Sequence, residues 1–556
     1  MRFLPLIAVF LSLGFECVLL ARQPVRARNA MVVSREPHAT DAGVAVLRAG
    51  GNAVDAAVAV GFALAVTHPS AGNIGGGGFM LIRFADGRST FLDFRERAPG
   101  RATRDMYLGP DGKPTRDSLA GWRAPGVPGT VRGLEYAAKK YGRKPWPEVL
   151  APAVALAAKG FPVSYGLARS LAASKLLAQF PESRRAFQRE GRHYEPDEPL
   201  VQPELARTLE RIARHGAADF YEGETARRLA AAMSEHGGLI ALEDLKSYAV
   251  VERKPLAGSY RGHEILTAPP PSSGGVGVLQ MLGVLEGSGY DKSGAGSAAT
   301  IHYLAEAMRR YFADRSEHMG DPDFVRVPVA GLLDKRYIAR LRQSIDPERA
   351  TPSEQVRPGS PAALESSETT HYSIVDREGN AVAVTYTLNG GYGSGVTVPG
   401  LGFLLNNEMD DFAAKPGAPN YYGLVQGEAN AIQPRKRPLS SMTPTIVLRE
   451  GRPWLIVGSP GGPTIINTVL QVIVNVIDFG MNVQEAVDWP RCHHQWLPDT
   501  LRVEPGFSPD TLRLLEARGF KLEKVRSIGE VAAILSDGGW LHGAADSRAE
   551  GKAAGY

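Results

Sequence analysis

The chain has 556 residues, of which 44% are hydrophobic and 22% charged, and its formal net charge is +4. This composition is typical of a soluble globular protein with a large core. The near balance of charge, without a basic stripe interleaved with aromatic residues, gives no indication of nucleic-acid binding.

The first 21 residues differ from the rest. One early arginine precedes an apolar run from Phe3 to Ala21, interrupted by Glu16. This pattern predicts a signal peptide over 1–21, with a membrane anchor as the alternative. The two cysteines are Cys17 and Cys492, so removal of the leader would leave one thiol and no intrachain disulfide. We therefore expect a bacterial periplasmic or secreted protein that is stabilised by its core.

In chain order, helices come first. Two Ala-rich helices are expected over 42–49 and 53–66, split by Gly50 and Gly51, and a strand pair follows in "FMLIRF" and "STFLDF". Residues 130–250 and 275–346 read as mainly helical, with several segments ending in glycine.

A polar, Pro- and Ser-rich stretch over 347–368 predicts an exposed linker. Strands are expected after it in "THYSIVDREGNAVAVTYTL", "GFLLNNEM" and "PTIVLREGRPWLIVGSP", followed by a helix and a last section of mixed helices and strands. Helices and antiparallel strands in separate runs indicate an α+β fold.

Several motifs have both a structural and a functional interpretation. "GNIGGGGFM" lacks the context of a phosphate loop and favours close backbone approach. For Ser272 and Ser273 in "PPPSSGG" we expect helix N-capping. For "RCHHQW" a structural role is favoured over a metal site, since no second Cys/His pair has ligand spacing. "VGSPGG", between a strand and a helix, is either an ordinary turn or an oxyanion-binding nest.

Polar residues also gather at the ends of predicted strands. They are Arg95 in "DFRER", Glu408, Asp410 and Asp411 in "NNEMDDF", and Ser440 and Ser441 in "RPLSSM". Each alone fits a solvated strand end. Together they supply carboxylates for an ammonium, and a guanidinium with hydroxyls for a carboxylate, which is what a zwitterionic amino-acid head requires.

Ten stretches in order resemble the γ-glutamyltransferase (γ-glutamyl transpeptidase) family of N-terminal-nucleophile hydrolases. They are "GGNAVDAAVA", "GNIGGGGFM", "DFRERAP", "GVPGTV", "PPPSSGG", "TTHYSIVD", "NNEMDDF", "RPLSSM", "GSPGG" and "HHQWLPD". The resemblance covers essentially the whole chain after the leader. It implies a four-layer αββα sandwich, no cofactor, and an enzyme that transfers γ-glutamyl groups from glutathione and related compounds to water, amino acids or peptides.

The resemblance also implies self-cleavage between Glu368 and Thr369, giving a large chain over 22–368 and a small chain over 369–556 that stay together as a heterodimer. Thr369 would be the nucleophile, with its freed α-amine as base. The implied partners of this nucleophile are Thr387 and the oxyanion-hole amides of Gly461 and Gly462. Arg95, Ser440 and Ser441 would bind the substrate α-carboxylate, and Asn389, Glu408 and Asp411 its α-amine.

Two details are specific to this sequence. Residues 415–430 resemble a lid found in some members, with Tyr422 as the lid tyrosine, and Tyr392 in "NGGYGSG" stands where phenylalanine is usual. Two alternatives remain open: a cephalosporin or glutaryl acylase of the same family, and a non-catalytic periplasmic protein that binds amino acids. Asp411, which would lie unpaired against an acyl group without an amine, argues against the acylase.

Overall fold

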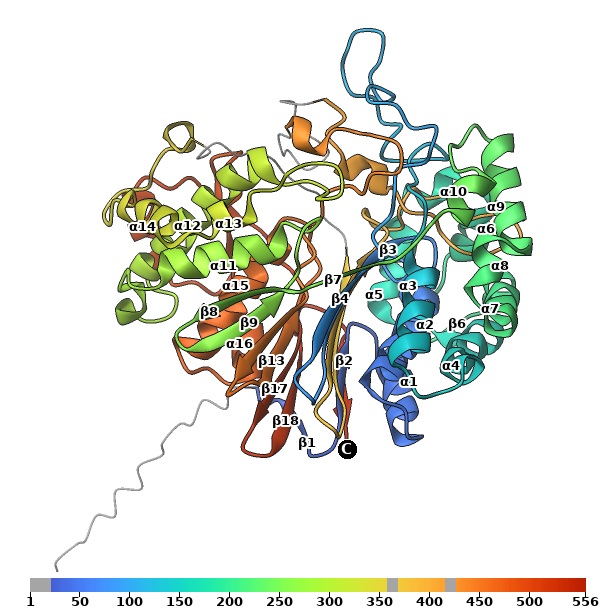
Figure 1. Ribbon diagram of the computed structural model, residues 1–556, viewed down its shortest axis with the longest axis horizontal. Helices are drawn as coiled ribbons and strands as arrows, with labels where there is room; N and C mark the ends of the chain where they lie inside the picture. Colours follow the sequence, from blue (N-terminus) through green and yellow to red (C-terminus); the bar gives the residue numbers. More distant parts are fainter. Residues whose placement is uncertain (1–21, 358–368, 416–426) are drawn as a thin grey trace, which may run out of the picture.

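The computed structural model describes residues 22–357, 369–415 and 427–556. Within these ranges two stacked β-sheets lie between two groups of helices (Figure 1). This is the four-layer αββα architecture that the resemblance implied. Across the same ranges, no helix combines the length and the apolar character needed to cross a bilayer.

The sheet that contains β10, here called the β10 sheet, has seven antiparallel strands among the described residues. Their spatial order is β19 (Lys552–Gly555), β2 (Met31–Ser34), β10 (Thr370–Val375), β11 (Ala381–Thr387), β3 (Gly77–Arg83), β4 (Ser89–Asp93) and β7 (Val251–Arg253). The predicted pair in "FMLIRF" and "STFLDF" is thus confirmed as β3 and β4.

The second sheet, here called the β13 sheet, also has seven antiparallel strands in the described part of the chain. Its order is β1 (Val25–Ala27), β18 (Trp540–Ala545), β17 (Ala532–Asp537), β13 (Arg452–Gly458), β12 (Thr445–Arg449), β9 (His263–Thr267) and β8 (Leu256–Tyr260). A smaller sheet joins β14 (Cys492–His493), β15 (Leu501–Val503) and β16 (Leu522–Lys524), and β5 (Phe161–Pro162) pairs with β6 (Pro199–Leu200).

Strands on both sides of the expected cleavage point alternate in the β10 sheet. β2 and β3 precede residue 368, whereas β10, β11 and β19 follow it. β10 pairs with β2 on one side and β11 pairs with β3 on the other. The two expected chains therefore share one hydrogen-bonded sheet.

One group of helices covers the β10 sheet, on the right in Figure 1. It comprises α1 (Pro37–Arg48), α2 (Ala53–Thr67), α3 (Thr130–Tyr141), α4 (Trp146–Lys159), α5 (Tyr165–Ala173), α6 (Pro181–Gln188), α7 (Pro203–His215), α8 (Ala217–Tyr221), α9 (Glu224–Glu235) and α10 (Leu242–Lys246). All residues of α2 are buried, as its Ala- and Val-rich sequence predicts.

The other group covers the β13 sheet. It comprises α11 (Gly274–Leu285), α12 (Ala298–His318), α13 (Val329–Leu332), α14 (Lys335–Gln343), α15 (Thr464–Ile477), α16 (Val483–Asp488) and α17 (Pro509–Ala517). Alternation along β2 explains the layering: Val32 belongs to the core beneath α2, whereas Met31 and Val33 belong to the core that includes the inter-sheet space.

One expectation about secondary structure is wrong. "GFLLNNEM" forms no regular strand; it makes one isolated bridge at Leu404 and then a short 3₁₀ turn over Glu408–Asp411. The stretch expected to be an exposed linker is mostly exposed over 347–357, although Arg309 donates to Ser353 Oγ at 2.6 Å and Trp496 donates to the Ser353 carbonyl at 2.9 Å. Residues 358–368 lie outside the described part.

Candidate active site

Thr369 lies immediately before β10, across from the end of β11. The antiparallel register pairs Thr370 with Tyr386, and continuing the same register by one residue sets Thr369 opposite Thr387. Both threonines are buried, at 6% and 2% exposure, and both line one pocket. The strand pair therefore brings together the two threonines that the resemblance singled out.

The position of Thr387 is fixed from two directions. The backbone N–H of Asn389 donates to Thr387 Oγ1 at 2.7 Å, and Asn73 Nδ2 donates to the Thr387 carbonyl at 2.8 Å. Asn389 has φ of 73°, in the left-handed region that a non-glycine residue seldom adopts. This turn directs the chain past the pocket, where Asn389 also lines the wall.

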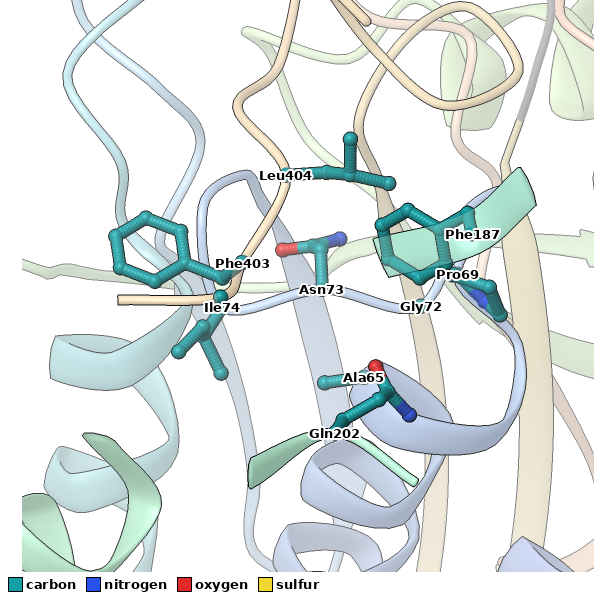
Figure 2. A pocket seen from close by; sticks show the side chains of 10 residues that line it. Ala65, Pro69, Gly72, Asn73, Ile74, Phe187, Gln202, Phe403 and Leu404 are labelled. Atoms are coloured by element: carbon teal, nitrogen blue, oxygen red, sulfur yellow. The ribbon is translucent and has the colours of Figure 1, made fainter. Parts of the chain in front are cut away.

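The glycine run allows the loop around Asn73 to approach β11. Figure 2 shows Asn73 on this loop, between Leu404 and Gln202. A Cβ on Gly76 would lie 2.0 Å from the Thr387 carbonyl oxygen, and one on Gly75 would lie 2.2 Å from that of Leu404. The expectation of close backbone approach is thus confirmed, and its consequence is the support of Thr387.

Arg95 occupies the opposite side of the pocket with a cluster of carboxylates. It follows β4 and is 1% exposed. Its guanidinium pairs with Glu408 Oε1 and Asp411 Oδ2, and Glu96 Oε2 lies 3.6 Å from Arg95 Nη1. One cation therefore faces three buried carboxyl groups, so their negative charge is only partly compensated.

Burial raises the pKa values of the acidic side chains in this region. It raises the pKa of Glu408 well above its ordinary value and that of Glu96 to about 7, although Arg95 opposes both shifts. Burial also raises the pKa of Asp410 to about 7, against the hydrogen bond from Ser118 Oγ at 2.7 Å. Burial thus favours the protonated, neutral forms of these carboxyl groups in the unliganded pocket.

Glu96 was missed by the sequence reasoning. It follows Arg95 directly in "DFRER", and neither of its carboxylate oxygens has a hydrogen-bond partner in the described structure. The available signal was an acid next to an arginine at the end of a buried strand. Sequence alone could not show that both side chains point inward.

Ser440 and Ser441 line the pocket next to Arg95. The Ser440 carbonyl accepts from Ser273 N at 2.7 Å and from Ser273 Oγ at 2.8 Å, and Arg315 donates to Ser441 Oγ at 3.2 Å. Of the two serines expected to cap α11, Ser272 accepts from the Gly274 N–H at 3.1 Å, whereas Ser273 does not cap. It occupies the N-cap position of α11 without a capping hydrogen bond from its side chain, and that side chain supports the Ser440 segment instead.

Gly461 and Gly462 lie in the turn between β13 and α15, with φ of 126° and 56°. They are not among the residues that line the pocket, but Ile465 in the first turn of α15 is. The Gly461 and Gly462 carbonyls accept from Thr464 and Ile465, respectively. The turn therefore lies at the edge of the pocket next to Ile465.

The structure thus gathers eight of the eleven predicted site residues around one pocket. Its lining residues are Arg95, Thr369, Thr387, Asn389, Glu408, Asp411, Ser440, Ser441, Met442 and Ile465. Its free volume is about 10 Å³, space for about one water molecule, because the Arg95 ion pairs fill it. Tyr422 lies outside the described residues.

The residues of "RCHHQW" are away from this pocket. Cys492, His493 and His494 are buried, and burial lowers the pKa of His493 to about 3 and that of His494 to about 4. Asn467 contacts His493 Nδ1 at 2.8 Å. These neutral, hydrogen-bonded rings act in packing. In the described ranges, no group of three or more His, Cys, Asp or Glu side chains is arranged to hold a metal ion.

The family model described as gamma-glutamyltranspeptidase matches residues 39–556. The chain belongs to this family. It is 53% identical over 529 residues to the glutathione hydrolase proenzyme of Escherichia coli (strain K12), covering 94% of this chain and 91% of that protein. It is 50% identical to the glutathione hydrolase proenzyme of Pseudomonas sp. (strain A14), covering 95% and 93%.

Among solved structures, the crystal structure of cephalosporin acylase from Bacillus halodurans superposes with a TM-score of 0.86 at 30% identity, covering 99% of both chains. This structure therefore shares the fold of the present chain over its full length. Its lower identity places the present chain nearer in sequence to the two glutathione hydrolase proenzymes than to this acylase.

Proposed function

We propose that this chain is the precursor of a γ-glutamyltransferase that also hydrolyses glutathione, with Thr369 as its nucleophile. The single observation that carries the proposal is the placement of two threonines, Thr369 and Thr387, in one buried pocket with a guanidinium and a carboxylate cluster. The pocket thereby combines a nucleophilic hydroxyl with charged groups that can bind a zwitterionic head group. A γ-glutamyl amide requires both.

Charge compensation explains the choice of substrate. Arg95 is shared by Glu408 and Asp411, and the raised pKa of Glu408 indicates that this group holds a proton there. A γ-glutamyl head brings an ammonium that takes over the two carboxylates, while its α-carboxylate receives Arg95 and the hydroxyls of Ser440 and Ser441. Binding of the ligand thus replaces the ion pairs within the protein by ion pairs between protein and ligand, and each buried charge keeps a partner.

The reaction begins with a proton transfer to an amine. Once freed by cleavage, the α-amine of Thr369 has an ordinary pKa of about 7.7–8.0, so part of it is neutral near neutral pH and can take the proton of Thr369 Oγ1. The oxygen attacks the γ-carbonyl, and the amide N–H groups of Gly461 and Gly462 receive the oxyanion. The amine leaves, and water or an amino acid or peptide then takes the γ-glutamyl group from Thr369.

In the uncut precursor the same nitrogen is an amide and cannot act as a base. We propose self-cleavage between Glu368 and Thr369 as the activating step, with chains over 22–368 and 369–556 remaining as a heterodimer. We further propose that residues 1–21 direct the protein to the periplasm or out of the cell, and that Tyr422 closes over the acyl-enzyme. The resemblance supports these assignments.

The test is the processing of the purified protein. Wild type is expected to give two bands on a denaturing gel, with Thr369 as the N-terminal residue of the smaller one. Thr369→Ala should remain a single chain, because the hydroxyl is required for the N→O acyl shift, and should release no p-nitroaniline from γ-glutamyl-p-nitroanilide. Cleavage of Thr369→Ala at the same bond would contradict the mechanism.

Thr370→Val is a matched control at the next position. The Thr370 hydroxyl is buried without a hydrogen-bond partner in the described structure, and the substitution conserves its shape. This variant should be cut and active. Glutaryl-p-nitroanilide distinguishes the acylase alternative, for which it would be the better substrate, and a wild-type protein that stays uncut would favour the non-catalytic alternative.

A further inference from the structure

A large second cavity lies apart from the Thr369 pocket. Its volume is about 640 Å³, within the range of about 300–1,000 Å³ typical of sites for small molecules. It lies between the start of α1, the end of α2, α5, and the segments around 526 and 547–550. None of the eleven site residues predicted from sequence lines it.

The carboxylates that line this cavity are already engaged. Glu36 accepts from the backbone N–H groups of His38 at 3.1 Å and Ala39 at 2.9 Å, at the start of α1. Glu550 accepts from Gly166 N at 3.0 Å and from Ser164 Oγ, at the start of α5. Both acids therefore cap helices and leave little negative charge directed into the cavity.

The arginines divide into two sets. Arg35 pairs with Glu530, and Arg548 donates to Glu504 Oε1 at 2.8 Å. In contrast, Arg169 on α5 and Arg526 before β17 are exposed and form no ion pair within the described ranges. The cavity thus presents two guanidinium groups from separate elements that have no carboxylate partner in the described ranges, and such groups bind carboxylates and phosphates in a bidentate manner.

Aromatic side chains supply an apolar part. Tyr165 is 61% exposed, although it is a large ring, and Arg169 lies 5.6 Å from its centroid. Phe161 packs edge-on against His38 at 5.7 Å between centroids. The lining therefore suits a small anion with an apolar or planar body.

Tyr392 joins the wall of this cavity to the Thr369 pocket. Its backbone N–H donates to the Ser70 carbonyl at 2.9 Å, and its hydroxyl lies 2.6 Å from Ser170 Oγ. Ser70 and Ser170 both line the cavity. Tyr392 belongs to the same turn as Asn389, which lines the Thr369 pocket, and both have positive φ, at 66° and 73°. The hydroxyl is the group that a phenylalanine at this position would lack.

We propose that this cavity binds a small organic anion, held by Arg169 and Arg526, and that the Tyr392 hydroxyl transmits its occupancy to Asn389. An anion that draws α5 toward Arg526 moves Ser170, and with it the turn that presents Asn389 to the substrate. The binding step stands on its own, whereas the transmitted effect rests on the proposed function.

Binding is tested by isothermal titration of the purified, processed protein with isophthalate, phenyl phosphate and the neutral isophthalamide. The first two distinguish carboxylate from phosphate ligands. At least one anion should bind, and the diamide should not. Arg169→Met combined with Arg526→Met should weaken the bound anion at least tenfold, while Arg513→Met, an exposed arginine on α17, should not. Equal binding by the double variant, or by the diamide, would overturn the proposed site.

Transmission is tested with γ-glutamyl-p-nitroanilide in the presence and absence of the anion that binds. In wild type the anion should change KM at least twofold, and the double arginine variant should show no such change. Tyr392→Phe should retain the anion's affinity but lose the change in KM. An unchanged KM in wild type, or a full response in Tyr392→Phe, would overturn the coupling while leaving the binding result intact. If wild type has no activity, the proposed function fails and the titration still decides the site.

Discussion

Arg95 and Asp411 show how single residues set the chemistry of the pocket. Each is almost fully buried, and each currently satisfies the other. Removing one partner from such a pair leaves the other charge buried and uncompensated, which costs more than the pair itself contributes. The effect of a substitution here should therefore depend on whether the bound substrate supplies the missing charge.

We predict that Asp411→Asn lowers kcat/KM for γ-glutamyl-p-nitroanilide roughly ten- to a hundredfold. A charge-assisted hydrogen bond to the ammonium is worth about 1.5–3 kcal/mol, and the amide cannot replace it. Glutaryl-p-nitroanilide, which has no amine, should be affected much less. The comparison uses initial rates on both substrates, and equal losses would show that Asp411 does not contact the α-amine.

Asp410 differs from its neighbour, because it faces Ser118 and has a buried oxygen without a partner in the described structure. Burial raises its pKa to about 7, so the folded state binds a proton between about pH 4 and pH 7 that the unfolded state releases. The contribution of this group to the free energy of unfolding is therefore fully present below about pH 4. It is lost as the pH rises through about 7.

Asp410→Asn should accordingly remove part of the pH dependence of stability. The amide resembles the protonated acid, so the advantage of the variant over wild type should be larger near pH 8 than near pH 5, by on the order of a few kcal/mol. Urea unfolding midpoints at the two pH values measure this. If the urea midpoint of wild type does not decrease from pH 5 to pH 8 relative to that of the variant, the raised pKa is contradicted.

At the scale of elements, the glycine run and β11 form one unit. Gly76→Ala places a Cβ against the Thr387 carbonyl, which is backbone and cannot move without displacing the strand. We expect this variant to be cut at least tenfold more slowly, or to misfold. Gly331→Ala is the control, because nothing lies within 4 Å of the added Cβ. Processing is followed on a gel, and normal cleavage of Gly76→Ala would show that the loop does not support Thr387.

Long apolar segments could be predicted from the sequence, because a run of small and β-branched apolar residues indicates burial on all sides. The helix over 53–66 and the strands at 370–375 and 381–387 follow this rule. "GFLLNNEM" did not, because Asn406 uses its side chain to bond Gly75 and Gly126 backbone groups, which fixes an irregular path. Such partners are far apart in sequence and leave no local signal.

The gathering of the candidate site residues could be predicted for a different reason. Resemblance supplied Thr369, Thr387 and Asn389, and the structure places them together. Residue types alone suggested Arg95 with Asp411 but could not place Glu96 or show that the Arg95 ion pairs fill the pocket. The ends of separate strands meet only once the sheets are formed, so distance and burial could not be read from spacing.

At the scale of the whole molecule, the two expected chains cannot part without breaking the β10 sheet. β10 pairs with β2, and β11 pairs with β3, so each contact crosses the cleavage point. We predict that the processed protein unfolds as one unit. In hydrogen–deuterium exchange, peptides that contain Met31–Ser34 and Thr370–Val375 should lose protection together as urea is raised, and earlier exchange of one peptide would contradict this.

The interleaved order of β2, β10, β11 and β3 has a consequence for measurement. If the chain cuts itself as proposed, the scissile bond reaches its reactive geometry only after strands from both ends of the sequence have joined. Each cut molecule is then a molecule that has folded, and the uncut fraction on a denaturing gel counts those that have not. Any substitution outside the Thr369 pocket could thus be scored for folding from band intensities alone, without substrate.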